Sequence, residues 1–114
     1  MPIANCIINP ELSAHTDLSD QTDIISIWSK QSGVAKEHMT INFVSSIAQL
    51  GKQYQVMATL QLPSIWSQEK ISILQLGLAT TLSKCFSIPS EQVHVVTSVI
   101  DSGLVVENGE QITW

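Results

Sequence analysis

The stretch Pro2-Ile3-Ala4-Asn5-Cys6-Ile7-Ile8 (PIANCII, residues 2–8) decides how the rest of the chain is arranged. It is apolar and rich in β-branched residues, and the turn-forming pair Asn9-Pro10 follows it. These features predict a strand that begins at the second residue of the sequence. Only Met1 precedes this strand.

The remainder of the first half predicts a helix and a second strand. Residues 11–20 are polar and turn-rich, with Asp17 or Ser19 as a possible helix cap. A helix is expected from near Asp20 to Gly33, because apolar residues recur at helical spacing: Ile24, Ile27 and Trp28. Alternating apolar and polar residues then predict a strand over 39–47, before a turn at 51–52.

The second half repeats this order of elements. Residues 54–62 alternate clearly and predict a strand that Pro63 stops. Ser67 is placed to cap a helix that runs to about Phe86, with an apolar stripe made by Ile71, Leu74, Leu78, Leu82 and Cys85 or Phe86. A strand over 93–100 follows. In the tail 101–114, Asn108-Gly109 predicts a short hairpin.

The element order predicts a tandem βαβ repeat, with halves over about 2–52 and 53–114, in a single domain over 1–114. The expected class is α/β (α+β): a four-stranded mixed sheet with two helices on one face. The other face would be bare and largely apolar. Only 13% of the residues are charged, so we expect other subunits to cover part of the surface.

Composition excludes several classes of partner and site. The formal net charge is −5 and the chain has no Arg, which argues against nucleic acid. No apolar run reaches the roughly 18 residues of a membrane span, so we expect no membrane partner. Cys6 and Cys85 are predicted to be buried thiols, and His15 and His38 lack partners at metal spacing. We therefore expect a cytoplasmic protein without metal or cofactor.

Several short segments carry a family resemblance. They are the PIAN start with its proline directly after Met1, Gly33 followed by Met39-Thr40-Ile41, and the end of the chain with Val93-His94-Val95-Val96, Gly103 and Asn108-Gly109-Glu110. Together with two βαβ units, they resemble the tautomerase superfamily of 4-oxalocrotonate tautomerase and macrophage migration inhibitory factor. The length is similar to that of the long, fused members. This resemblance implies that three subunits pack their sheets into a barrel, giving a homotrimer.

The resemblance also implies that Pro2 is catalytic once Met1 is removed. A chain-end amine has a pKa of roughly 7.7 to 8.0, and an apolar pocket lowers it further because burial disfavours the ammonium. A neutral amine can move a proton between the carbon and the oxygen of a keto–enol pair. The expected activity is that of a keto–enol tautomerase on a small enol or keto acid. Proline at position 2 also has a purely structural explanation, since it is common there and strand edges tolerate it.

Two further site residues are predicted from the resemblance. His94 stands where 4-oxalocrotonate tautomerase has a catalytic arginine and the cytokine-like relative has an active-site tyrosine, so it is a candidate to polarise a carbonyl. Lys36 is the candidate to bind a substrate carboxylate. The chain departs from the family where basic or polar partners are expected: at Leu12, Val34 and Val96. These departures put a dicarboxylate substrate in doubt and leave a neutral or singly charged keto acid.

Three alternatives remain open at this stage. The superfamily site also serves hydration and dehalogenation of unsaturated acids, which the sequence does not exclude. The loss of basic partners supports a competing hypothesis, a trimeric binding or interaction protein that keeps the scaffold without efficient catalysis. An unrelated ferredoxin-like domain would share the order of elements and differ in strand order.

Overall fold

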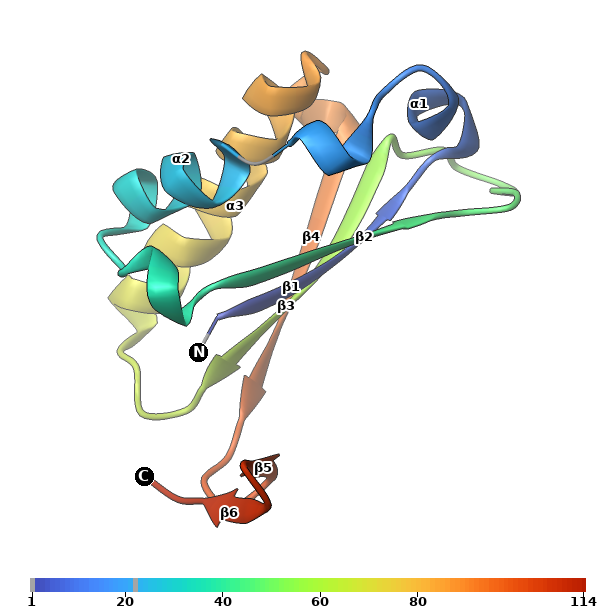
Figure 1. The fold of residues 1–114 in the computed structure, drawn as a ribbon. Coiled ribbons are helices and arrows are strands. Elements are labelled where there is room, and N and C mark those ends of the chain that lie inside the picture. The colour runs from blue at the N-terminus through green and yellow to red at the C-terminus, as the bar shows by residue number, and fades with distance from the viewer. Residues whose placement is uncertain (1, 22) are drawn as a thin grey trace.

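A computed structural model describes residues 2–21 and 23–114 of the chain (Figure 1). The first βαβ unit and its links contain β1 (Ile3–Ile8), α1 (Pro10–Ala14), η1 (Leu18–Asp20), α2 (Asp23–Ser32), η2 (Lys36–His38) and β2 (Thr40–Ser45), where η marks a 3-10 helix. The second contains β3 (Val56–Pro63), α3 (Gln68–Phe86), η3 (Ser90–Gln92) and β4 (Val93–Ile100). The tail forms β5 (Val105–Glu107) and β6 (Glu110–Ile112).

The four long strands form one mixed sheet in the order β2-β1-β3-β4. β1 runs parallel to β2, β3 runs parallel to β4, and the two central strands β1 and β3 are antiparallel. The two parallel strands of each βαβ unit are therefore neighbours. In a ferredoxin-like split βαβ unit another strand separates them. The strand order thus excludes the ferredoxin-like alternative.

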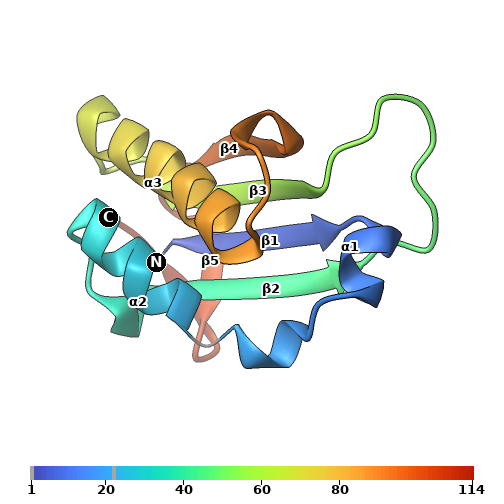
Figure 2. The ribbon, with the colours of Figure 1, turned by 90° about the horizontal axis from the view of Figure 1, so that it is seen from above.

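Helices α2 and α3 lie side by side on one face of the sheet (Figures 1 and 2). Burial alternates along the strands accordingly, and the fully buried residues of β1 face the helices: Ala4, Cys6 and Ile8. Trp28 of α2 is also fully buried, and its Nε1–H donates to the carbonyl oxygen of Leu74 in α3 at 3.0 Å. Gly77 permits this close approach, because a Cβ at that position would lie 3.3 Å from the Cβ of Gln31. The expected two-helix layer is therefore present.

Several predicted ends are confirmed in the structure. The Ser67 hydroxyl accepts from the backbone N–H of Lys70 at 3.2 Å and caps α3, and β4 spans 93–100 as expected. Gly33 follows α2 with a φ of 74°, a conformation that favours glycine. Residues 51–52 form a bend, with a φ of 81° at Gly51.

Residues 11–20 are more ordered than predicted. The Asn9 side chain accepts from the backbone N–H of Glu11 at 3.0 Å, and Pro10 occupies the first turn, so α1 forms where only turns were expected. Asp17 does act as a cap, but for η1, since it accepts from the N–H of Ser19 at 3.0 Å. The predicted start of the next helix near Asp20 is wrong, because α2 begins at Asp23. Met1 and Thr22 lie outside the described residues.

The face without helices, called the bare face below, is less apolar than predicted. Its row of Val44, Ile7 and Met57 is apolar, and Ile7 and Val44 are 46% and 55% exposed. The next row, two residues along, is polar except for the exposed Val96, and there the Asn42 side-chain N–H donates to the Asn5 Oδ1 at 2.8 Å. In the described part of the chain, no helix is both long and apolar enough to cross a membrane.

Candidate active site

Pro2 lies immediately before β1 and its side chain is fully buried. Its carbonyl oxygen accepts from the backbone N–H of Thr40 at 3.0 Å. This bond ties the start of β1 to the start of β2, which follows η2. The backbone of Pro2 is therefore held at a fixed place in the fold.

A cavity of about 360 Å³ lies on the bare face, and Pro2 itself is not among the described residues that line it. Its sheet wall is made by Ile3, which directly follows Pro2, and by Gln61 and Ile100. The tail segment 104–107 makes the other wall. The volume lies within the range of small-molecule sites, and five of the seven described lining residues are apolar, with one amide, Gln61, and one carboxylate, Glu107. This part of the molecule, with Pro2, is called the cavity end below.

The β5–β6 hairpin completes the cavity end. Asn108 and Gly109 form its two-residue loop, with φ values of 53° and 75° that match a type I′ turn. The Trp114 indole N–H donates to the Ser64 Oγ at 3.0 Å, and the backbone N–H of Gly103 donates to the Ile112 carbonyl oxygen at 3.0 Å. The predicted hairpin is therefore present and is anchored within its own chain.

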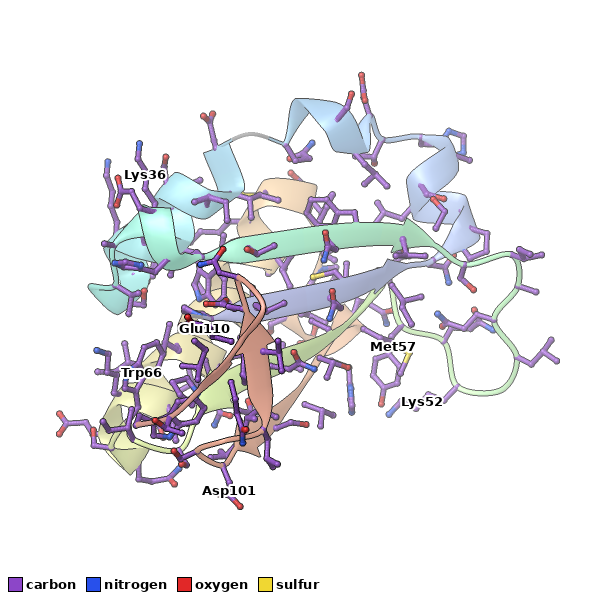
Figure 3. All side chains as sticks on the ribbon, turned by 60° about the horizontal axis from the view of Figure 1, so that its bottom comes forward. Lys36, Lys52, Met57, Trp66, Asp101 and Glu110 are labelled. Carbon is purple, nitrogen blue, oxygen red and sulfur yellow. The ribbon has the colours of Figure 1, made fainter. Side chains whose placement is uncertain are left out.

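His94 lies on the bare face at the opposite end of the sheet, where it pairs with Met57. Its ring centroid is 5.1 Å from that of Tyr54, with the two planes inclined at 51°. The Lys52 Nζ lies 5.4 Å from the Tyr54 ring centroid. In Figure 3, Lys52 and Met57 are found together, away from the hairpin residue Glu110. Lys52, Tyr54 and His94 are called the ring end below.

One chain does not bring Pro2 and His94 together. Ile3 pairs with Gln61, and Gln61 pairs with Ser98, four residues beyond His94 on β4. At about 3.3 Å per strand residue, His94 lies about 13 Å along the sheet from the cavity end. Lys36 is exposed in η2 and is not among the residues that line the cavity.

Sequence reasoning missed four polar residues of these two ends: Gln61, Glu107, Lys52 and Tyr54. Gln61 interrupts an apolar strand with a polar side chain on the bare face, and this was a usable signal. Tyr54 was assigned to the predicted strand over 54–62, whereas β3 begins at Val56 and Tyr54 turns toward His94. Nothing in the sequence indicated that the tail folds back over Ile3.

The two cysteines lie outside both ends. Cys6 is buried under the helices, and burial raises the pKa of its thiol to about 12. Burial, and to a smaller extent the charge of Asp23, raises the pKa of Cys85. Both thiols are free and are poor nucleophiles near neutral pH. Within 2–21 and 23–114, no three His, Cys, Asp or Glu side chains gather as a metal site would require.

Comparison with known proteins gives structural matches. No protein-family model matches the sequence, and no curated protein matches it. A fused 4-OT described as an asymmetric trimer matches with a TM-score of 0.78 and 13% identity, over 96% of this chain and 94% of that one. N1, a member of the cis-3-chloroacrylic acid dehalogenase family, matches with a TM-score of 0.74 and 11% identity, over 96% and 82%.

The macrophage migration inhibitory factor of Toxoplasma gondii matches with a TM-score of 0.63 and 8% identity, over 97% of this chain and 98% of that one. The similarity thus extends over nearly the whole chain and includes three kinds of tautomerase-superfamily structure. At these identities it establishes the fold and leaves the chemistry to be argued from the residues.

Proposed function

We propose that this chain, which has the fold of the tautomerase superfamily, is a keto–enol tautomerase whose base is the amine of Pro2. The observation that carries the proposal is the fully buried Pro2, which directly precedes Ile3 in the wall of a cavity where five of the seven described lining residues are apolar. Removal of Met1 would free the amine. An apolar surrounding disfavours the ammonium form, so the nitrogen would be neutral and basic at working pH.

The proposed reaction needs no group beyond those of the protein and its substrate. The Pro2 nitrogen takes the proton of the enol hydroxyl while the C=O bond forms and the C=C electron pair moves to carbon. The resulting ammonium returns the proton to that carbon, so the amine is regenerated. A hydrogen-bond donor at the oxygen lowers the energy of the developing charge, and His94 is our candidate for this donor.

We propose that His94 reaches this oxygen from a neighbouring copy, in a homotrimer. Within one chain Pro2 lies one residue beyond Ile3, so it is about 16 Å from His94 along the sheet, too far for one hydrogen bond. The bare face exposes Ile7 and Val44, and burying such side chains against a second copy would stabilise the assembly. The fused 4-OT match described as a trimer supports this arrangement.

We also propose that residues 1–114 form one tautomerase-like domain in a cytoplasmic protein. Lys36 is the candidate that the sequence offers to bind a substrate carboxylate. Both cysteines are free, as expected of a reducing, cytoplasmic setting. Hydration or dehalogenation at Pro2 is a related possibility that the match to the dehalogenase-family member supports.

Ketonisation of phenylenolpyruvate by wild type and by Pro2→Ala tests the proposal. General acid–base catalysis contributes about 10²- to 10⁴-fold, so we expect Pro2→Ala to lose about 100-fold or more in kcat. Intact mass measured on the same sample should show that Met1 is absent. Equal rates for the two proteins, or a retained Met1 in a fully active sample, would contradict it.

A trimeric binding protein on the same scaffold is the second candidate. It is favoured by one observation: among residues 2–21 and 23–114, no basic side chain lines the cavity. If wild type and Pro2→Ala are equally inert on a panel of enols, while wild type still binds a keto acid in calorimetry, this candidate replaces the first.

A further inference from the structure

We propose that Lys52, held over Tyr54 beside His94, binds the carboxylate of the substrate in the site that a neighbouring copy completes. The proposal rests on the proposed function, because it requires His94 of one copy to approach Pro2 of another. It replaces Lys36 as the cation of the site and adds Tyr54 as the residue that positions it.

The ring end is a continuous row of three side chains. The Lys52 Nζ lies 5.4 Å from the Tyr54 ring centroid, and the Tyr54 and His94 centroids are 5.1 Å apart. An ammonium at this distance from a ring is attracted by the ring's quadrupole. Any copy that delivers His94 to a neighbour's cavity therefore delivers Lys52 with it.

The loop that carries Lys52 is anchored at both ends. Asn9, at the end of β1, donates from its side chain to the Gln53 Oε1 at 3.2 Å, and its backbone N–H donates to the Gln55 carbonyl oxygen at 2.9 Å. The backbone N–H of Gln55 donates to the Gln92 carbonyl oxygen, just before β4, at 2.9 Å. Tyr54 N–H also donates to the Gln49 Oε1 at 2.6 Å. Lys52 is thus presented from a bonded loop although its own side chain is exposed.

The distribution of charge leaves Lys52 as the suitable cation. The chain has five lysines and no Arg, and three of the lysines belong to the helix layer: Lys30, Lys70 and Lys84. The fourth, Lys36, is exposed in η2 and lies in a different segment from His94, whereas Lys52 is linked to His94 through the Tyr54 ring. Lys70 already lies over the Trp66 ring, with its Nζ 4.5 Å from the centroid. The described residues that line the cavity include a carboxylate, Glu107, and no basic group. A substrate carboxylate at Pro2 therefore needs a cation from outside that cavity, and Lys52 arrives with His94.

The test compares an acid with its neutral analogue. The substrates are phenylenolpyruvate and the enol form of its methyl ester, and the variants are Lys52→Gln, Lys52→Arg and, as matched control, Lys84→Gln on the exposed side of α3. Loss of a hydrogen bond to a charged group should raise the KM of Lys52→Gln for the acid at least about tenfold. Its kcat for the acid and both constants for the ester should stay within about twofold. Lys52→Arg should recover most of the affinity, and Lys84→Gln should match wild type.

Other outcomes separate the two proposals. If wild type ketonises the acid, Pro2→Ala does not, and Lys52→Gln has an unchanged KM, the Lys52 assignment fails while the proposed function stands. Lys36→Gln is assayed in the same way, and if it raises the KM while Lys52→Gln does not, the cation is Lys36 and the assignment fails equally. If sedimentation shows that Lys52→Gln alone dissociates the oligomer, Lys52 is an interface contact and the assignment is overturned. If wild type is inert on acid and ester alike, both proposals fall.

Discussion

Along β1, neighbouring residues have opposite surroundings: Ala4 and Cys6 are fully buried under the helices, whereas Asn5 and Ile7 face the side without helices. The helix-covered face holds nearly the whole apolar core. The bare face holds the cavity end, the ring end and a polar row between them. Because side chains alternate between the two faces of the sheet, the same strands serve two purposes. The side chains on one face stabilise the fold, and those on the other are available for a site.

The largest expected effect contrasts two adjacent residues of β3. Leu60 is fully buried under the helices, while Thr59 lies exposed on the bare face. Leu60→Ala should lower the free energy of unfolding by about 2 to 5 kcal/mol, because it removes buried contacts and leaves a cavity. Thr59→Ala should lower it by less than about 1 kcal/mol. Urea denaturation at one fixed protein concentration measures both, and similar losses would break the contrast.

Substitution of Asn9, which directly follows β1, tests whether its hydrogen bonds hold the loop that carries Lys52 and Tyr54 of the ring end. Its side chain accepts from the Glu11 N–H at 3.0 Å and donates to Gln53 at 3.2 Å. Asn9→Ala should cost about 1 to 2 kcal/mol of unfolding free energy and speed hydrogen exchange over residues 49–55. Asp17→Ala, which removes the cap of η1, is the matched control and should leave exchange in that loop unchanged. Unchanged exchange in Asn9→Ala would mean that the loop is held by other contacts.

The hairpin of the cavity end should respond more weakly. Gly109 has a φ of 75°, and a side chain there costs about 1 kcal/mol. Gly109→Ala should therefore loosen the hairpin and raise the KM for an enol severalfold, with little change in global unfolding. Gly109→Asn keeps a residue that tolerates this conformation and should lie between Ala and wild type. A KM that is the same in all three proteins would remove the hairpin from the site.

The smallest effect concerns the two thiols at neutral pH. Burial raises the pKa of the Cys6 thiol to about 12, so Cys6 should resist a thiol reagent in the folded protein. The half-buried Cys85 should react slowly. In the unfolded chain the Cys6 thiol regains its ordinary pKa of 9.0, so stability should be unaffected below that pH and fall as the pH rises above it. Equal labelling of both thiols would contradict the assigned burial.

The local parts of the fold could be predicted from the sequence and the long-range parts of the site could not. Alternation over β3, the stripe of α3 and the Asn108-Gly109 turn are properties of neighbouring residues, and each predicted its element. The meeting of Ile3 with the tail, and of Tyr54 with His94, depends on segments about 40 or more residues apart. Asn9-Pro10 was interpreted as a turn, because the same pair of residues is typical of a turn and of the capped start of a helix such as α1.

Mixed oligomers test most directly whether Pro2 of one copy works with the ring end of another. Pro2→Ala and a Lys52→Gln/His94→Ala chain, each with its own tag, are co-expressed, and oligomers that carry both tags are purified and assayed for phenylenolpyruvate ketonisation. In a closed ring of three, every mixed oligomer has one junction where an intact Pro2 meets an intact ring end, so we predict about one-third of the wild-type activity. Mixed oligomers no more active than the two parent variants would contradict the shared site.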